Sequence, residues 1–148
     1  MIDALVIAHV VATIAMAGLI WFVQVVHYPL MARVGEAGFV QYEAAHVRLT
    51  TVVVAPFMLT ELTTAVWLWL EWVEPRWMTN WGLGLLFVVW ISTAVFQVPC
   101  HRVLERGFDA AVVKRLVATN WIRTLGWSAR AALAMALAWS VAATPITG

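Results

Sequence analysis

The sequence QVPCH at Gln97–His101 ends a long apolar segment with two polar side chains, and QVVH at Gln24–His27 ends another segment in the same way. A polar side chain at the end of an apolar segment is costly unless it has a partner or a function. Nineteen positions after the His of each stretch stands a further polar residue, His46 in one case and Asn120 in the other. The two stretches therefore predict two helices whose polar ends face one shared site.

The composition around these stretches is that of a membrane protein. Of the 148 residues, 64% are hydrophobic and only 11% are charged, whereas a soluble globular chain is about half apolar and about a quarter charged. The ten Trp residues fit the same class, because Trp is enriched at bilayer interfaces. The net charge of +1 says little about partners, and no basic block suggests a nucleic-acid partner. The single cysteine, Cys100, excludes an intrachain disulfide.

Four apolar segments are long enough to cross a bilayer, which takes about 20 helical residues. We expect one transmembrane domain over 1–148, with spans at about 4–30, 47–73, 81–100 and 121–143. The first segment lacks the positively charged start of a secretory signal, so we take it as a retained helix. Because a backbone in lipid must satisfy its own hydrogen bonds, the predicted fold class is all-α, an integral membrane antiparallel four-helix bundle.

Two of the three connections keep helical periodicity. Residues 37–45 and 109–119 carry apolar side chains at helical spacing, and Gly35 and Gly107 suit the turns before them. The second and fourth helices are therefore expected to begin before their apolar spans, which gives two long helical hairpins. The Gln–His ending and its nineteen-residue partner occur in both hairpins, which predicts a pseudo-twofold axis along the membrane normal.

The distribution of Lys and Arg predicts the orientation of the bundle. The first and third connections lie on one side of the bundle, and the second connection and the two chain ends lie on the other. The second side has only one cation, Arg76. The first and third connections and the residues beside them carry Arg33, Arg48, Arg102, Arg106, Lys114 and Arg115. By the positive-inside rule, these basic connections lie in the cytoplasm. The predicted location is the inner (plasma) membrane, with several spans, both termini outside and the His residues on the cytoplasmic side.

The topology brings polar residues from all four helices to the cytoplasmic end. His27, His46 and His101 are the predicted metal ligands, because imidazoles from several helices suit copper, iron or zinc. Glu43 has Glu-x-x-His spacing with His46 and is expected to be a fourth ligand or a general base. Arg123 is expected either to hold an anionic substrate or to pair with Glu43. The residues expected to orient ligands or water are Gln24, Gln97 and Asn120.

Further polar groups lie inside the apolar spans. Arg130 is expected to form a buried ion pair that fixes helix register, with Glu61 among its candidate partners. His9 and Glu61 both fall near the outer side, where a His–Glu hydrogen bond would satisfy them. Pro99 lacks an amide donor and is expected to bend the helix that carries His101.

The first helix, with His9, Gly18, Trp21 and the sequence HYPL at His27–Leu30, resembles the first helix of CopD-like copper-resistance proteins. It is also similar to the haem-dependent membrane protoporphyrinogen oxidases of bacteria. That resemblance is confined to the first helix and implies that His9 would bind haem b. The strings QV…H and NWIRT resemble a four-helix membrane family of unknown activity, which implies no chemistry.

Three functions follow from these observations. The leading one is a membrane metalloprotein, an oxidoreductase with copper or non-haem iron, or with zinc as a third metal. Its site at the bilayer edge would act on a lipid-soluble small molecule such as a quinone. The second is haem b ligation by two of the same His residues, in an electron-transfer or haem-dependent protein. The third is an accessory subunit or small transporter without chemistry, within a homo-oligomer or a larger membrane complex, whose polar cluster sets helix packing.

Overall fold

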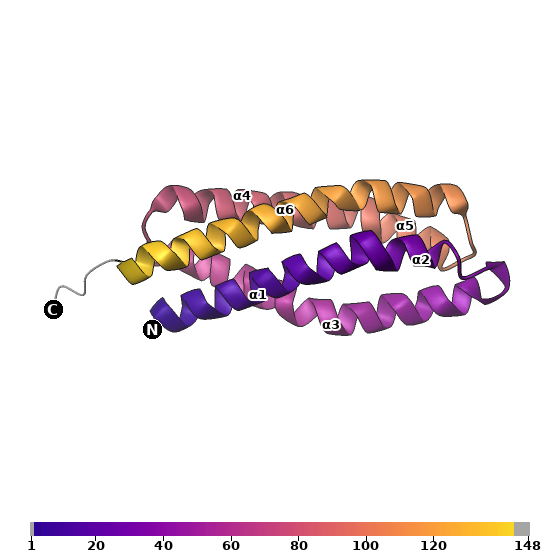
Figure 1. Ribbon diagram of the computed structural model, residues 1–148, viewed down its shortest axis with the longest axis horizontal. Helices are drawn as coiled ribbons and strands as arrows, with labels where there is room; N and C mark the ends of the chain where they lie inside the picture. Colours follow the sequence, from indigo (N-terminus) through magenta and orange to yellow (C-terminus); the bar gives the residue numbers. More distant parts are fainter. Residues whose placement is uncertain (1, 144–148) are drawn as a thin grey trace.

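The computed structural model describes residues 2–143, which fold into four antiparallel helical rods joined by turns at 32–35, 71–75 and 105–109 (Figure 1). Each rod is long and apolar enough to cross a membrane by length and composition, and the four are Ile2–Met31, Glu36–Leu70, Arg76–Leu104 and Ala110–Ala143. This confirms the prediction of an all-helical four-helix bundle for the described part of the chain. The predicted position of the two chain ends concerns residues 1 and 144–148, which fall outside the described residues.

The second and fourth rods are continuous helices that begin before their apolar spans, as their periodicity predicted. They are α3 (Glu36–Leu70) and α6 (Ala110–Ala143). Gly35 precedes α3 with a positive φ of 84°, a conformation that favours glycine. The Asp109 carboxylate precedes α6 and accepts hydrogen bonds from the amides of Ala111 and Val112, at 2.8 and 3.1 Å.

The third rod, unlike the second and fourth, begins earlier than the sequence predicted. The sequence predicted a connection over 74–80 and a span from about 81, whereas α4 (Arg76–Ser92) already includes residues 76–80. Pro75 stands directly before the first helical residue, where its missing amide hydrogen costs no helical bond. The turn between α3 and α4 is therefore only five residues long, at 71–75.

The first and third rods each contain one π-helical turn that ends two residues before a proline. The remaining elements of these rods are α1 (Ile2–Phe22), η1 (Val23–His27), α2 (Tyr28–Met31), η2 (Thr93–Gln97) and α5 (Val98–Leu104). A proline ring clashes with the carbonyl four residues earlier, and a widened turn can absorb this clash inside a continuous rod. The bend expected at Pro99 is thus a local change of helical pitch, and Pro29 has the same effect in the first rod.

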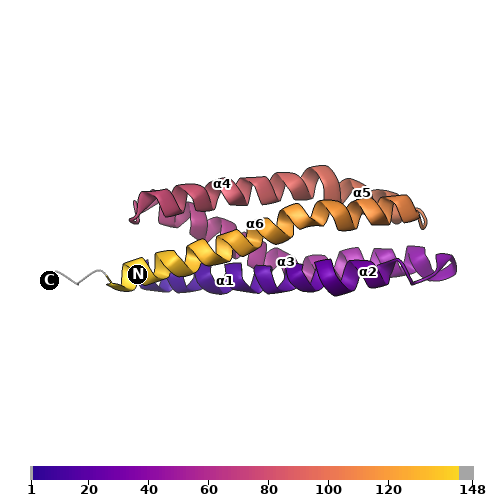
Figure 2. The ribbon, with the colours of Figure 1, turned by 45° about the horizontal axis from the view of Figure 1, so that its top comes forward.

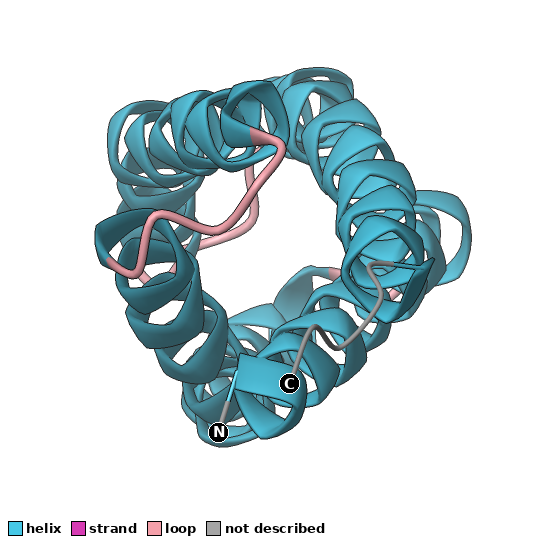
Figure 3. Ribbon diagram, turned by 90° about the vertical axis from the view of Figure 1, so that its left-hand side faces the viewer, coloured by secondary structure: helices cyan, strands magenta, loops and turns pink. Residues whose placement is uncertain are grey.

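The helices α1 and α6 form the central pair, with α3 packed on α1 and α4 packed on α6 (Figures 1 and 2). Viewed along the rods, the four are arranged around a common centre (Figure 3). Met16, Ile20, Val89 and Trp127 fill the interior between these helices. In contrast, α3 and α5 touch over a short stretch only. The sparse contact between these two helices determines where the site opens.

Candidate functional site

The three predicted His residues meet near the turns at 32–35 and 105–109. His27 ends η1, His46 lies on α3 and His101 lies on α5. His27 Nε2 lies 2.8 Å from His46 Nδ1, and these two rings are stacked with their centroids 4.4 Å apart. The His101 ring is 5.2 Å from the His46 ring, centroid to centroid. We refer to His27, His46 and His101 as the His cluster.

Glu43 is buried directly against this cluster. Its Oε1 lies 2.5 Å from His101 Nδ1, and its side chain is completely inaccessible. A buried carboxylate in this position orients the ring and stabilises a proton on Nδ1. The opposite nitrogen, His101 Nε2, lies 3.2 Å from the Tyr28 hydroxyl. Glu43 Oε2 is buried and has no hydrogen-bond partner in the described part of the chain, so an acceptor at the site is left over.

Hydroxyl groups surround the other two imidazoles. Thr50 Oγ1 lies 3.0 Å from His46 Nδ1, and the Tyr42 hydroxyl lies 3.4 Å from His27 Nε2. Sequence reasoning did not assign a role to Tyr28 or Tyr42. The available signal was position, because Tyr42 stands four residues before His46 on the same helical face and Tyr28 follows His27 directly.

The amide residues predicted to orient ligands form a network of their own. Asn120 Nδ2 donates to Gln24 Oε1 at 2.9 Å, and Arg123 Nη1 donates to Asn120 Oδ1 at 3.1 Å. Gln97 donates to the Thr119 hydroxyl at 3.2 Å, at the same end of the bundle. Gln24 and Asn120 therefore position the Arg123 guanidinium rather than an imidazole.

Arg123 is a buried cation that does not pair with Glu43, which the sequence had offered as one of its partners. The two ion pairs among residues 2–143 are Glu43–His101 and Glu61–Arg130. Arg123 is only 8% exposed, and its Nε has no hydrogen-bond partner in that range. Its guanidinium lies 5.2 Å from the centre of the Trp127 ring. A positive charge is thus held inside the bundle by an amide and an aromatic face.

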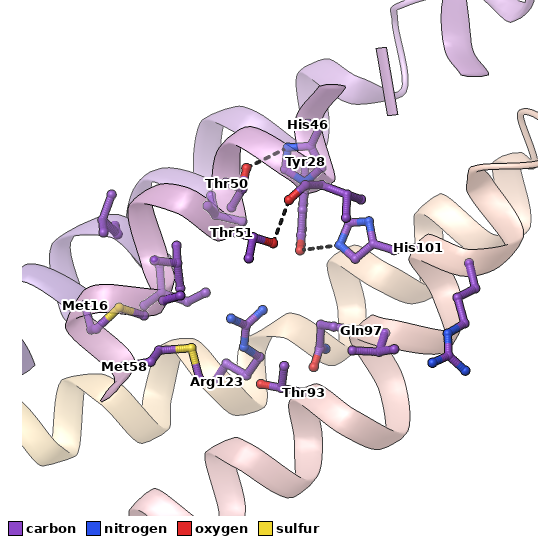
Figure 4. A pocket seen from close by; sticks show the side chains of 18 of the residues that line it. Met16, Tyr28, His46, Thr50, Thr51, Met58, Thr93, Gln97, His101 and Arg123 are labelled. Atoms are coloured by element: carbon purple, nitrogen blue, oxygen red, sulfur yellow. Dashed lines mark hydrogen bonds between the residues drawn. The ribbon is translucent and has the colours of Figure 1, made fainter. Parts of the chain in front are cut away.

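A cavity of about 360 Å³ brings His46, His101, Tyr28 and Arg123 together, as Figure 4 shows. Most of its wall is apolar, and the apolar lining includes Met16, Ile20, Val23, Val54 and Met58. The cavity is also lined by exposed residues of α3 and α5, namely Thr51, Val98 and Arg102, and by Glu105 in the turn after α5. Because α3 and α5 pack over a short stretch only, the cavity opens sideways between them.

The second polar cluster lies farther along the bundle. Arg130 Nε donates to Glu61 Oε1 at 2.7 Å, which confirms the expected ion pair. The expected His9–Glu61 hydrogen bond is wrong, because Trp127 donates to the other oxygen of Glu61 at 2.8 Å. His9 Nδ1 instead lies 2.9 Å from the Thr64 hydroxyl, beside a cavity of about 20 Å³. That space is far too small for the haem implied by the resemblance of the first helix.

No protein-family model, curated protein or solved structure matches this chain. Among residues 2–143, no group of three or more His, Cys, Asp or Glu side chains is arranged to hold a metal ion as it stands. In the His cluster, the nitrogens face one another and their hydrogen-bond partners. The function is therefore inferred from the geometry of the site itself.

Proposed function

We propose that this chain is an integral membrane protein that binds one transition-metal ion, copper or iron, in the His cluster and uses it to oxidise or reduce a lipid-soluble substrate. One observation carries the proposal: imidazoles from three rods lie against one another, and a fully buried carboxylate is bonded to one of them. Imidazole nitrogen is the donor that these metals favour in proteins.

The spacing within the cluster supports a shared ion. When two imidazole nitrogens bind the same metal ion at about 2.1 Å each, the two nitrogens lie roughly 3 Å apart. His27 Nε2 and His46 Nδ1 are 2.8 Å apart, so both rings would have to turn their nitrogens away from each other and toward a shared ion to replace their hydrogen bond by two metal bonds. The Glu43–His101 contact is the carboxylate–imidazole pairing that orients metal-binding His residues, and His101 Nε2 would be the third donor in place of its contact with the Tyr28 hydroxyl.

The surroundings of the cluster support a lipid-soluble substrate. The cavity wall is mostly apolar and opens between α3 and α5. Large apolar side chains are exposed on the outer faces of the rods, among them Val52, Leu70, Phe87 and Trp139. Exposed large apolar side chains of this kind suit lipid contact. A substrate dissolved in the bilayer would therefore reach the cavity without crossing water.

The proposed placement in the inner membrane puts the turns 32–35 and 105–109, and with them the His cluster, on the cytoplasmic side. Its support is the cationic character of this end, which carries Arg33, Arg102 and Arg106. The two π turns, each two residues before a proline, support the proposed pseudo-twofold relation between the hairpins.

Elemental analysis and an absorption spectrum of the protein purified in mild detergent test the metal site. We expect one copper or iron per chain, and its loss from the His27→Ala/His46→Ala double variant. The matched control is His9→Ala, which removes a buried imidazole at the far end of the bundle and should leave the metal content unchanged. Helicity by circular dichroism checks that each variant folds.

The same measurement separates the alternatives. A Soret band would support haem b instead, although the direct contact of His27 and His46 leaves no room for a macrocycle between those two rings. Metal content that is unchanged in the double variant would overturn the site. A colourless, metal-free protein with normal helicity would favour the accessory-subunit or transporter function, with a polar cluster that only sets helix packing.

A second candidate function uses the same residues without a metal. Glu43, His101 and Tyr28 form a chain of contacts at 2.5 and 3.2 Å that ends in the cavity. A carboxylate that orients an imidazole, which in turn contacts a hydroxyl, is the arrangement of general acid–base catalysis. Substrate turnover that persists after complete metal removal would favour this function.

A further inference from the structure

Arg123 presents a positive charge to the cavity with no anion beside it. The two carboxylates that form buried ion pairs in residues 2–143 are used by other partners, Glu43 by His101 and Glu61 by Arg130. The Arg123 side chain is 8% exposed, and its buried Nε lacks a hydrogen-bond partner within the same range. A buried cation that has no counter-ion is unfavourable in a membrane protein, even where an amide and an aromatic ring contact it. An anion from outside the chain would remove this penalty.

The polar end of the cavity has the groups that such an anion needs. Figure 4 shows the Arg123 guanidinium pointing into the cavity that Tyr28 and His101 line from the other side. The planar guanidinium offers two parallel N–H donors, which match the two oxygens of a carboxylate. Gln24 and Asn120 hold this donor fork in place through the chain of hydrogen bonds at 2.9 and 3.1 Å.

The charge balance of the site selects a monoanion. Glu43 is bonded to His101 and does not compensate Arg123, so the single positive charge of Arg123 remains to be matched. A single carboxylate would neutralise Arg123. A phosphate dianion would instead leave an excess negative charge in a mostly apolar cavity, where like charges repel strongly.

The remainder of the cavity selects an apolar chain. Its wall beyond Arg123 is formed by Met16 and Ile20 of α1 and by Val54 and Met58 of α3. Cavities of about 300–1,000 Å³ hold one drug-sized molecule, so the volume of about 360 Å³ admits one acyl chain and not a whole phospholipid with two chains. The opening between α3 and α5 faces the direction from which a bilayer lipid would enter.

We propose that the cavity binds a single-chain fatty carboxylate, with its carboxylate on Arg123 and its acyl chain along Met16, Ile20, Val54 and Met58. The inference names the substrate class of the proposed function and rests on it for the membrane setting and the cavity. The binding itself does not require the metal, so it can be tested on metal-free protein.

Binding of radiolabelled laurate to the protein in nanodiscs of uncharged lipid tests the proposal. We expect saturable binding of one laurate per chain, before and after metal removal with a chelator. Arg123→Leu should weaken this binding at least about tenfold, since a charge-assisted pair is worth about 1.5–3 kcal/mol. The matched control is Arg48→Leu, which removes an exposed cation of α3 outside the cavity and should leave laurate affinity unchanged.

Further ligands and variants keep the test decisive. Dodecanol, which has the same chain without the charge, should bind the native protein and Arg123→Leu equally. If Arg123→Leu does not fold, Arg123→Lys and Tyr28→Phe replace it, and both should weaken laurate binding. Equal affinity for laurate and dodecanol would overturn the proposal, and tighter binding of dodecyl phosphate would assign the site to phosphate. If the native protein binds laurate but contains no metal, the proposed metal site is overturned and the fatty-carboxylate site is not.

Discussion

Glu61 and Arg130 show how residues in this bundle keep a charge inside an apolar interior. Both oxygens of the Glu61 carboxylate are satisfied, one by Arg130 Nε at 2.7 Å and one by Trp127 Nε1 at 2.8 Å. Arg130 also donates to the Gly82 carbonyl of α4. Neither charged side chain is more than 2% exposed. The pair therefore joins α3, α4 and α6 through contacts that water cannot replace.

Removal of one partner from this pair should destabilise the bundle strongly. Arg130→Met leaves the Glu61 charge buried without a cation, and such changes cost about 3–5 kcal/mol. The double variant Glu61→Gln/Arg130→Met removes both charges and keeps an oxygen that accepts from Trp127. Its free energy of unfolding should therefore be larger than that of Arg130→Met alone. Unfolding in mixed micelles, followed by circular dichroism, measures both. Additive losses from the two substitutions would contradict this account of the pair.

Glu43 should control the affinity of the His cluster for the metal ion that we propose. Glu43→Gln keeps the size of the side chain but removes the charge that holds His101 Nδ1, and loss of such a partner typically lowers metal affinity about 10–100-fold. Competition against a chromophoric chelator measures the change. Glu105→Gln is the control, because Glu105 lines the mouth of the same cavity but is exposed. Equal metal affinities of Glu43→Gln and Glu105→Gln would contradict a role of Glu43 in metal binding.

The sequence predicted which residues gather at the site better than it predicted how they pair. Helical rise gives the depth of a residue along a rod, which placed His27, His46 and His101 at one level. Pairing also depends on how each rod is rotated about its own axis, which short apolar segments do not specify. The offered Glu43–Arg123 and His9–Glu61 pairs failed for this reason, whereas Arg130–Glu61 was among the expected pairs.

At the scale of the elements, the starts of α3 and α6 were predictable and the π turns were not. Amphipathic periodicity continues through 37–45 and 109–119, so the helices extend past the apolar spans. A proline inside a helical segment predicts a disturbance, but a kink, a break and a widened turn all relieve the same clash. In both rods the structure has the widened turn, at Val23–His27 before Pro29 and at Thr93–Gln97 before Pro99.

The helices α6 and α4 approach each other closely at Gly126. A Cβ added at Gly126 would lie 2.6 Å from Val89 Cγ2, and Val89 is a fully buried, β-branched side chain with little freedom to move. Gly126→Ala should therefore lower the free energy of unfolding by about 1–3 kcal/mol, despite the better helix propensity of Ala. Gly18→Ala is the matched control, because no atom lies within 4 Å of the added Cβ.

The Gly18→Ala control should be neutral or slightly stabilising, by up to about 1 kcal/mol, since Ala exceeds Gly in helix propensity by that amount. Both variants can be followed by the same micelle-based unfolding measurement. Equal stability of Gly126→Ala and Gly18→Ala would show that α4 and α6 can separate at no cost, which would contradict the tight contact at Val89.

At the scale of the whole molecule, composition and span length predicted the four-rod architecture, because few other structures suit a chain that is 64% hydrophobic. The neighbours of each rod were not predictable in the same way. The central pair of α1 and α6, and the sparse contact of α3 with α5, depend on side-chain fit along the rods. The cavity results from that uneven packing, so no sequence motif predicts it.

The orientation of the whole bundle is the remaining prediction, and it decides on which side of the membrane the metal would be acquired. In a Cys100→Ala background, Val34→Cys and Glu105→Cys place a thiol in the two turns beside the His cluster, and Glu71→Cys places one in the opposite turn. A membrane-impermeant maleimide should label Glu71→Cys in intact cells, and the other two only after permeabilisation, because the positive-inside rule places the cations Arg33, Arg102 and Arg106 in the cytoplasm in the proposed orientation. The reverse pattern would put the His cluster outside the cell, and labelling of all three thiols in intact cells would contradict a membrane-spanning bundle.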